Sequence, residues 1–211
     1  MERHKVIYFF DPLCITCYSF ETVISRLVKK FSSDFYFDIL SGGMVTGNRV
    51  GPLSQKTDYL KKKIAAIENT TGVKFGDAYK NVLEEGTMVS DSEPPSIAFN
   101  VFKSFRPDLR FQLAHGIQNL HFWGGKDLNL MKTYFDICDL FEINKFGFMD
   151  RFQDPAYKQL TLSTFQQVKD WGIIHFPTIS YEKEGQLKLI TEGYEPYEKL
   201  EKAFLSAIDN I

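Results

Sequence analysis

The chain has 211 residues, of which 44% are hydrophobic and 25% charged, a balance typical of a folded globular protein and not of a disordered one. This length suits one large domain, or a small domain that carries an insertion. The net charge is −2, and the basic residues do not form the broad stripe that a nucleic-acid-binding protein carries. We therefore exclude nucleic acid as the partner.

The first forty residues predict a strand, a helix and a second strand. Residues 5–10 are β-branched and aromatic, as in a buried strand. Apolar residues recur at helical spacing from about 15 to 31, and at strand spacing from 35 to 40. We expect the first strand to supply no buried acid for proton transfer.

The apolar run from 6 to 10 is too short for the core of a signal peptide. The sequence contains no stretch near the roughly 20 apolar residues of a membrane span. We therefore expect a cytoplasmic protein with no membrane partner.

Glycines from Gly42 to Gly51 interrupt the pattern, and from about 53 to 152 the sequence predicts helices and no strand. The segment 91–95 has the residues of a capped helix start. Pro107 is expected to open a helix that reaches about residue 123, and Asp127 to cap another that reaches about residue 141.

The last sixty residues return to a mixed pattern. Pro155 is expected to start a long helix, with Leu160, Leu162, Phe165 and Val168 as its apolar positions, and Gly172 to end it. After it we expect short strands at 178–182 and 187–191, a turn at 183–186, and a final helix that begins at Pro196.

The predicted fold class is therefore α/β, with a discontinuous domain interrupted by an all-helical insertion. The boundaries that we expect are 1–45 and 153–211 for the discontinuous domain, and 46–152 for the insertion.

The motif Cys14-Ile15-Thr16-Cys17 carries the chemistry. Two cysteines three residues apart at a helix start lie about one turn from each other, within the Cα separation of about 4.4–6.8 Å that a disulfide needs. Free N–H groups and the helix dipole stabilise negative charge at this end, so Cys14 is expected to react as a thiolate. Cys17 lies one turn further in and is shielded. We infer that Cys14 attacks a disulfide and Cys17 resolves the mixed disulfide.

A zinc site is the main alternative for two such cysteines, but zinc requires about four ligands and the sequence has no second pair. We therefore expect no metal. Cys138 is interpreted as a buried apolar filler of its helix.

Four segments together resemble a known family: Tyr8 to Tyr18, Gly42-Gly43-Met44, Ser90 to Pro94, and His175-Phe176-Pro177-Thr178. They are similar to the DsbA-like oxidoreductases, and within them to the FrnE-like branch. The resemblance covers nearly the whole chain. It implies a thioredoxin fold interrupted by a helical domain, with disulfide oxidoreductase or isomerase activity.

The resemblance also implies a substrate-binding surface beside the dithiol. It consists of Phe176, a cis Pro177, Gly43 and Met44. The candidate supporting residues are Asp11, Glu21 as a proton relay, and His175 near the proline loop. Relatives often carry Trp or His between the cysteines. This chain has Ile15 and Thr16 there, so no imidazole assists the thiolate.

We expect the substrates to be disulfide-containing peptides or proteins, with glutathione or a thioredoxin system as electron source and no bound cofactor. One alternative is a glutathione-dependent enzyme of the kappa transferase or 2-hydroxychromene-2-carboxylate isomerase type. Those enzymes usually have Ser where Cys14 stands and lack the second Cys. A non-catalytic binding module, such as a holdase, is the other alternative.

Overall fold

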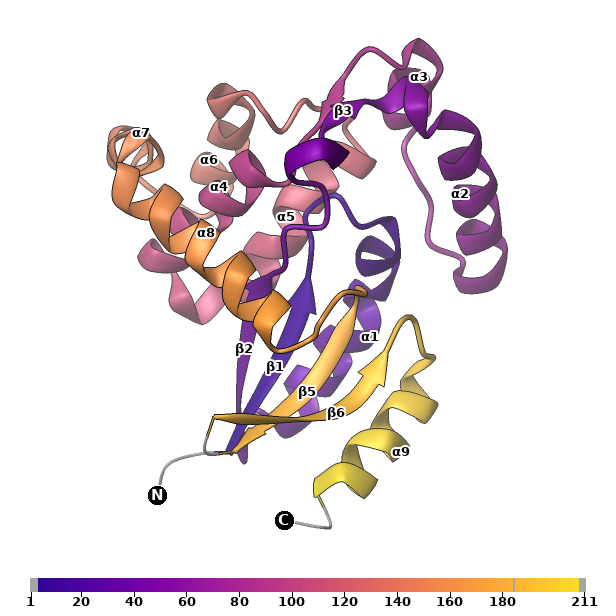
Figure 1. The fold of residues 1–211 in the computed structure, drawn as a ribbon, viewed down its shortest axis with the longest axis vertical. Coiled ribbons are helices and arrows are strands. Elements are labelled where there is room, and N and C mark those ends of the chain that lie inside the picture. Colours follow the sequence, from indigo (N-terminus) through magenta and orange to yellow (C-terminus); the bar gives the residue numbers. More distant parts are fainter. Residues whose placement is uncertain (1–3, 184, 209–211) are drawn as a thin grey trace.

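The computed structural model describes residues 4–183 and 185–208. Figure 1 shows the elements in chain order. The strands are β1 (His4–Phe10), β2 (Phe35–Ser41), β3 (Gly51–Pro52), β4 (Val89–Ser90), β5 (Thr178–Lys183) and β6 (Gln186–Glu192). The helices are α1 (Ile15–Phe31), α2 (Thr57–Thr71), α3 (Asp77–Glu85), α4 (Glu93–Phe105), α5 (Arg110–Phe122), α6 (Phe135–Leu140), α7 (Lys145–Gln153), α8 (Pro155–Asp170) and α9 (Tyr197–Ile208).

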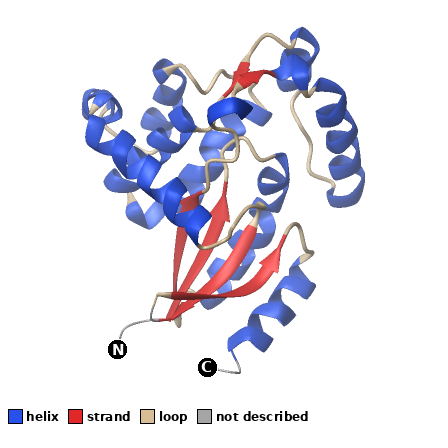
Figure 2. Cartoon of the chain, viewed as in Figure 1, coloured by secondary structure: helices blue, strands red, loops and turns tan. Residues whose placement is uncertain are grey.

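Strands from the two ends of the chain form one sheet in the order β2-β1-β5-β6. β1 pairs with β2 in parallel, whereas β5 pairs antiparallel with both β1 and β6. Figure 2 shows this sheet in red, with helices around it. A parallel β1–α1–β2 unit joined to an antiparallel hairpin and a last helix is the expected thioredoxin-like α/β arrangement.

Alternate side chains of β1 enter two different apolar layers, as strand geometry requires. Val6, Tyr8 and Phe10 belong to the main core, which includes Phe20 of α1 and Phe204 of α9. Ile7 and Phe9 point the other way and pack with Val168 of α8. The sheet is therefore covered on both faces, which explains the almost unbroken apolar sequence of β1.

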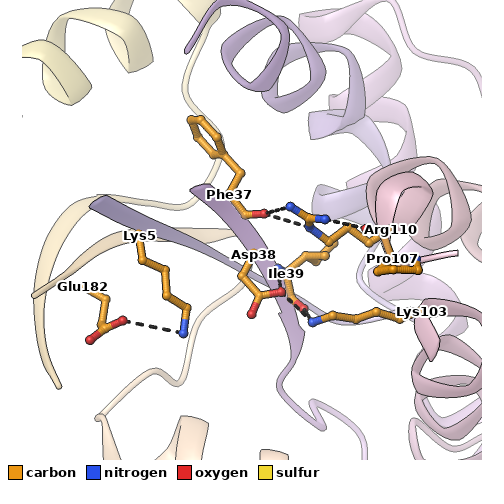
Figure 3. Close-up of polar contacts among 8 residues, drawn as sticks. All are labelled: Lys5, Phe37, Asp38, Ile39, Lys103, Pro107, Arg110 and Glu182. Carbon is orange, nitrogen blue, oxygen red and sulfur yellow. Dashed lines mark hydrogen bonds and ion pairs between the residues drawn. The ribbon is translucent and has the colours of Figure 1, made fainter. Parts of the chain in front are cut away.

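Two cations protect the edge strand β2, as Figure 3 shows. Arg110 at the start of α5 donates from Nε to the Phe37 carbonyl at 2.8 Å. Lys103 of α4 pairs with the Asp38 carboxylate and donates to the Ile39 carbonyl at 3.1 Å. An edge strand whose carbonyls are already paired offers little to another chain. These contacts also fix the helical segment against the sheet.

The structure corrects three expectations for the middle of the chain. Val89–Ser90 forms a short strand with Gly51–Pro52, in a region where we expected none. Asp127 does not cap a helix, because its carboxylate accepts the Asn129 N–H in a turn. The helical structure begins only with the 3₁₀ turn Met131–Tyr134, and α6 ends before Phe141.

Two further elements differ from the sequence prediction. Pro107 opens a 3₁₀ turn, Pro107–Leu109, and α5 follows it. Helix α8 has the expected bounds, but the side chains of Leu160 and Leu162 are exposed. The expected turn at 183–186 includes residue 184, which lies outside the described residues, although β5 and β6 pair on either side of it.

Candidate active site

Cys14 is the N-cap of α1, in an extended conformation with φ −85° and ψ 107°. Its Sγ accepts the backbone N–H of Cys17 at 3.2 Å, as the side chain of an N-cap residue should. An N–H donor and the positive end of the helix dipole therefore both face this sulfur. The local sequence thus places the Cys14 sulfur at the N-terminus of α1, in the turn that follows β1.

Cys17 is almost completely buried beneath Cys14, and both are free thiols in this structure. Burial is the main cause that raises the pKa of Cys17 well above its usual value, and the neighbouring Cys14 raises it further. The two sulfurs are therefore unequal: the inner one holds its proton.

The loop before β5 closes over Cys14. The peptide bond between Phe176 and Pro177 is cis. The Cys14 thiol donates to the Phe176 carbonyl at 3.5 Å, which links residues 162 positions apart. The structure thus brings together the dithiol and the proline loop, two motifs that only the family resemblance connected.

Asp11, the first residue after β1, is fully buried. Its carboxylate accepts hydrogen bonds from the N–H of Leu13 at 2.9 Å, the N–H of Met44 at 2.7 Å and the hydroxyl of Ser92 at 2.9 Å. Burial raises the pKa of Asp11 to about 6, although these three donors lower it. The first strand itself supplies no buried acid, as expected, but Asp11, one of the predicted supporting residues, places one directly after it.

The Gly42-Gly43-Met44 loop lies directly against this site. Gly43 has φ +66°, and a Cβ atom there would approach the ring of Phe165 to 2.7 Å. A Cβ atom on Gly42 would fall 2.0 Å from the ring of Phe176. Glycine at both positions allows the aromatic rings to approach the backbone closely. At Gly43 it also allows the positive φ.

Glu21, one turn beyond Cys17, is half-buried and accepts the hydroxyl of Ser25 at 2.8 Å. Its charge raises the pKa of Tyr8, a buried phenol of β1. The larger causes at Tyr8 are burial, the charges of Cys17 and Cys14, and a hydrogen bond with the Cys17 thiol. Tyr8 is therefore a polar neighbour of the inner cysteine.

His175 is exposed, and its backbone carbonyl accepts the Thr178 hydroxyl at 2.8 Å. No hydrogen bond of its ring to Cys14 occurs in the described part of the chain. Cys138 is buried in α6, away from the motif, and burial raises its pKa to about 11. An inert, protonated thiol fits the filler interpretation.

Sequence reasoning missed three residues of the site: Tyr8, Ser92 and Gln118. Ser92 holds the Asp11 carboxylate from the start of α4, and its Oγ also accepts the Val45 N–H at 3.0 Å. Gln118 of α5 donates from Nε2 to the backbone carbonyl of Asp11 at 3.1 Å. Ser92 belongs to a segment that carries the family resemblance, but a Ser before a helix is normally interpreted as a cap, and a Gln in a helix as a surface residue, so neither was assigned to the site.

Within residues 4–183 and 185–208, no group of three or more His, Cys, Asp or Glu side chains is placed to hold a metal ion. The helices described there include none long and apolar enough to span a membrane.

Solved structures with the same fold include two disulfide enzymes. A candidate protein disulfide isomerase from Nitrosomonas europaea has 28% identity and a TM-score of 0.89, over 99% of each chain. The cytosolic disulfide reductase DsbM from Pseudomonas aeruginosa has 22% identity and a TM-score of 0.79, over 98% of each chain.

A 2-hydroxychromene-2-carboxylate isomerase is a more distant neighbour, with 13% identity and a TM-score of 0.66, over 98% of this chain and 95% of the other. Neither the protein-family models nor the curated proteins gave a match. The chain thus has a thioredoxin-like fold with a capped Cys14–Cys17 dithiol, and over its full length it is similar to solved disulfide oxidoreductases.

Proposed function

We propose that this protein reduces or exchanges disulfides in peptides or proteins through Cys14 and Cys17. The observation that carries the proposal is the position of the Cys14 sulfur. It receives the Cys17 N–H at the start of α1, beside the carbonyl of Phe176. The nucleophile in disulfide exchange is a thiolate, and an N–H donor at a helix start favours one. The backbone of the proline loop gives an extended substrate segment a place to pair.

The reaction has two exchange steps. The Cys14 thiolate attacks one sulfur of the substrate disulfide, a mixed disulfide forms, and the other substrate sulfur leaves as a thiolate that takes up a proton. Cys17 then loses its proton and attacks the Cys14 sulfur, which releases the second substrate thiol. The substrate gains two electrons, and the enzyme is left with a Cys14–Cys17 disulfide.

Asp11, Tyr8 and Glu21 support the second step. Cys17 must lose a proton in a buried place, where its pKa is high. Asp11, with a pKa of about 6, is a base of suitable strength in the same turn. The substrate is held by Phe176, Pro177, Gly43 and Met44; the Phe176 carbonyl contacts the Cys14 sulfur, and the Met44 N–H contacts Asp11.

The enzyme returns to the dithiol form when two glutathione molecules, or a thioredoxin system, supply two electrons. The likeness to DsbM, which has been solved with glutathione, supports this electron source. We also propose a cytoplasmic location, where such reductants keep thiols reduced. Membership of the FrnE-like branch stays a prediction.

The division into a discontinuous domain (1–45 and 153–211) and a helical insertion (46–152) is also a proposal. The four-stranded sheet draws only on the two ends of the chain, which supports it. The main apolar core, however, runs from Phe10 to Phe99 and Phe102 of α4 without a break.

Three cysteine variants test the function in an insulin-reduction assay with non-reducing gels. Cys17→Ser should trap mixed disulfides, because attack survives and resolution does not. Cys14→Ser should abolish turnover and trap little, because Cys17 is shielded. Cys138→Ser is the matched control and should behave as the unaltered protein. Normal turnover by Cys14→Ser, or activity only as a glutathione transferase or isomerase on small electrophiles, would favour the kappa-like alternative. Binding of unfolded protein without any turnover would favour the holdase.

A further inference from the structure

A groove of about 590 Å³ opens between the loop 42–50, helix α8 and the segment 173–176. Phe176 contacts both the groove and Cys14. Its side chain lines the groove, and its carbonyl accepts the Cys14 thiol at 3.5 Å. A polypeptide held on Cys14 therefore has the groove within reach of its neighbouring residues.

The groove is kept open by the two glycines of its inner wall. The ring of Phe176 packs on Gly42 and the ring of Phe165 on Gly43, at distances that leave no space for a Cβ atom. A side chain at either position would have to displace one of these rings. The sequence thus preserves a recess here and not merely a turn.

The outer wall, from α8, combines the apolar Leu162 and Phe165 with Gln166 and the cation Lys169. Residues 159–168 of α8 contain no Asp, Glu, Lys or Arg. Leu162 lines the groove with 38% of its surface exposed, and Ile174, at the other rim, is 68% exposed. Large apolar side chains left exposed in a groove are typical of a binding surface.

The charges at the ends of the groove favour an anion. Its two acids are already compensated, because Glu93 pairs with Lys158 at 2.7 Å and Asp91 accepts the Glu93 N–H at 2.9 Å, at the positive end of α4. Of its two cations, Arg49 interacts electrostatically with the buried Asp11 carboxyl. Arg49 donates to the Gly43 carbonyl at 3.4 Å, and Lys169 has no acidic partner among the described residues. The uncompensated charge is positive.

We propose that this groove binds the part of a polypeptide substrate next to the attacked cysteine, and that it selects an extended segment with an apolar and an acidic residue. The apolar side chain packs on Leu162 and Phe165, and the carboxylate faces Lys169 and Arg49. The proposal rests on the disulfide reductase function and adds substrate selection to it.

Two synthetic peptide disulfides test the proposal. They share an apolar residue beside the cysteine and differ only in an adjacent Glu or Lys. Glutathione disulfide, which has carboxylates but no apolar residue beside its cysteines, serves as a substrate that cannot pack on Leu162. The measured quantity is kcat/KM for the reduction of each. We expect the unaltered enzyme to prefer the Glu peptide by about fivefold, the scale of one exposed ion pair.

Two groove variants should change this pattern in different ways. Lys169→Glu should reverse the preference between the peptides. Leu162→Asn should lower kcat/KM by about fivefold for both, and leave glutathione disulfide reduction unchanged. The matched controls are Leu160→Asn, on α8 but outside the groove, and Lys202→Glu, exposed on α9. Both should resemble the unaltered enzyme.

The outcomes separate the groove from the function. The groove proposal is overturned if the unaltered enzyme reduces both peptides equally, or if the Lys169→Glu variant keeps the preference for the Glu peptide. Either result leaves the reductase function in place. A loss in Leu162→Asn that extends equally to glutathione disulfide also overturns it. Failure of the unaltered enzyme to reduce any of the three substrates overturns the proposed function itself.

Discussion

The buried Asp11 carboxyl should make the stability of the protein depend on pH in a direction unusual for an acid. Its pKa is raised from 3.8 to about 6, mainly by burial. A raised pKa means that the folded protein holds this proton more tightly than the unfolded chain does. The stability that the neutral form contributes is therefore complete below about pH 4 and is lost as the pH rises through 6.

The size of the effect follows from the shift. About two pKa units at 1.36 kcal/mol each give roughly 3 kcal/mol of unfolding free energy between pH 4 and pH 7. Asp11→Asn does not titrate, so the difference in unfolding free energy between the unaltered protein and this variant isolates the effect. We expect that difference to fall by about 3 kcal/mol over this range.

Urea unfolding under reducing conditions, at half-unit steps from pH 4 to pH 7.5, measures this difference. Ser92→Ala provides a matched test of the cause. The Ser92 hydroxyl donates to the carboxylate and lowers its pKa, so its removal should move the decline to higher pH. A difference that stays constant within about 0.5 kcal/mol, or grows as the pH rises, would refute the argument.

Two further variants test the walls of the site. Gly43→Ala should lower the unfolding free energy by about 1–3 kcal/mol in urea titrations, since it combines a positive φ with a Cβ that meets the ring of Phe165; unchanged stability would show that the ring moves freely. Tyr8→Phe should leave the formation of the mixed disulfide at Cys14 unchanged but slow its resolution about tenfold in rapid mixing, because the phenol no longer stabilises the Cys17 thiolate. Equal resolution rates in the two proteins would exclude this role of Tyr8.

The sequence predicts well the elements whose signals are local. The predicted bounds of β1, α1 and β2 agree closely with the structure. Each is marked by a signal that lies within a few residues: an apolar run for β1, a capped start for α1 and a period of two for β2. Helices α3 and α7 were not predicted. Helix α7 is capped by Asn144, whose side chain accepts the Gly147 N–H, and its sequence contains a glycine that weakens the helical pattern.

Contacts between segments that are distant in the sequence could not be predicted from local sequence patterns. Leu160 and Leu162 fit the helical apolar pattern of α8, yet Thr161 and Val168 are the buried residues, because a pattern does not show which face another element will cover. Ser92 and Gln118 reach the Asp11 region across 81 and 107 positions of sequence. Only the folded chain brings these donors to one point.

The turn between β1 and α1 shows why such distant donors matter for the chemistry. The Asp11 side chain and backbone accept the N–H groups of Leu13 and Cys14, and the Cys14 sulfur accepts that of Cys17. The N–H groups of Ile15 and Thr16 remain, and in the first turn of a helix they have no intrahelical acceptor. Because Asp11 fixes the start of this turn, and Ser92 and Gln118 fix Asp11, the free donors stay directed at the end of the helix where the thiolate forms. The helical segment thus contributes to the reactivity of Cys14 although it supplies neither cysteine.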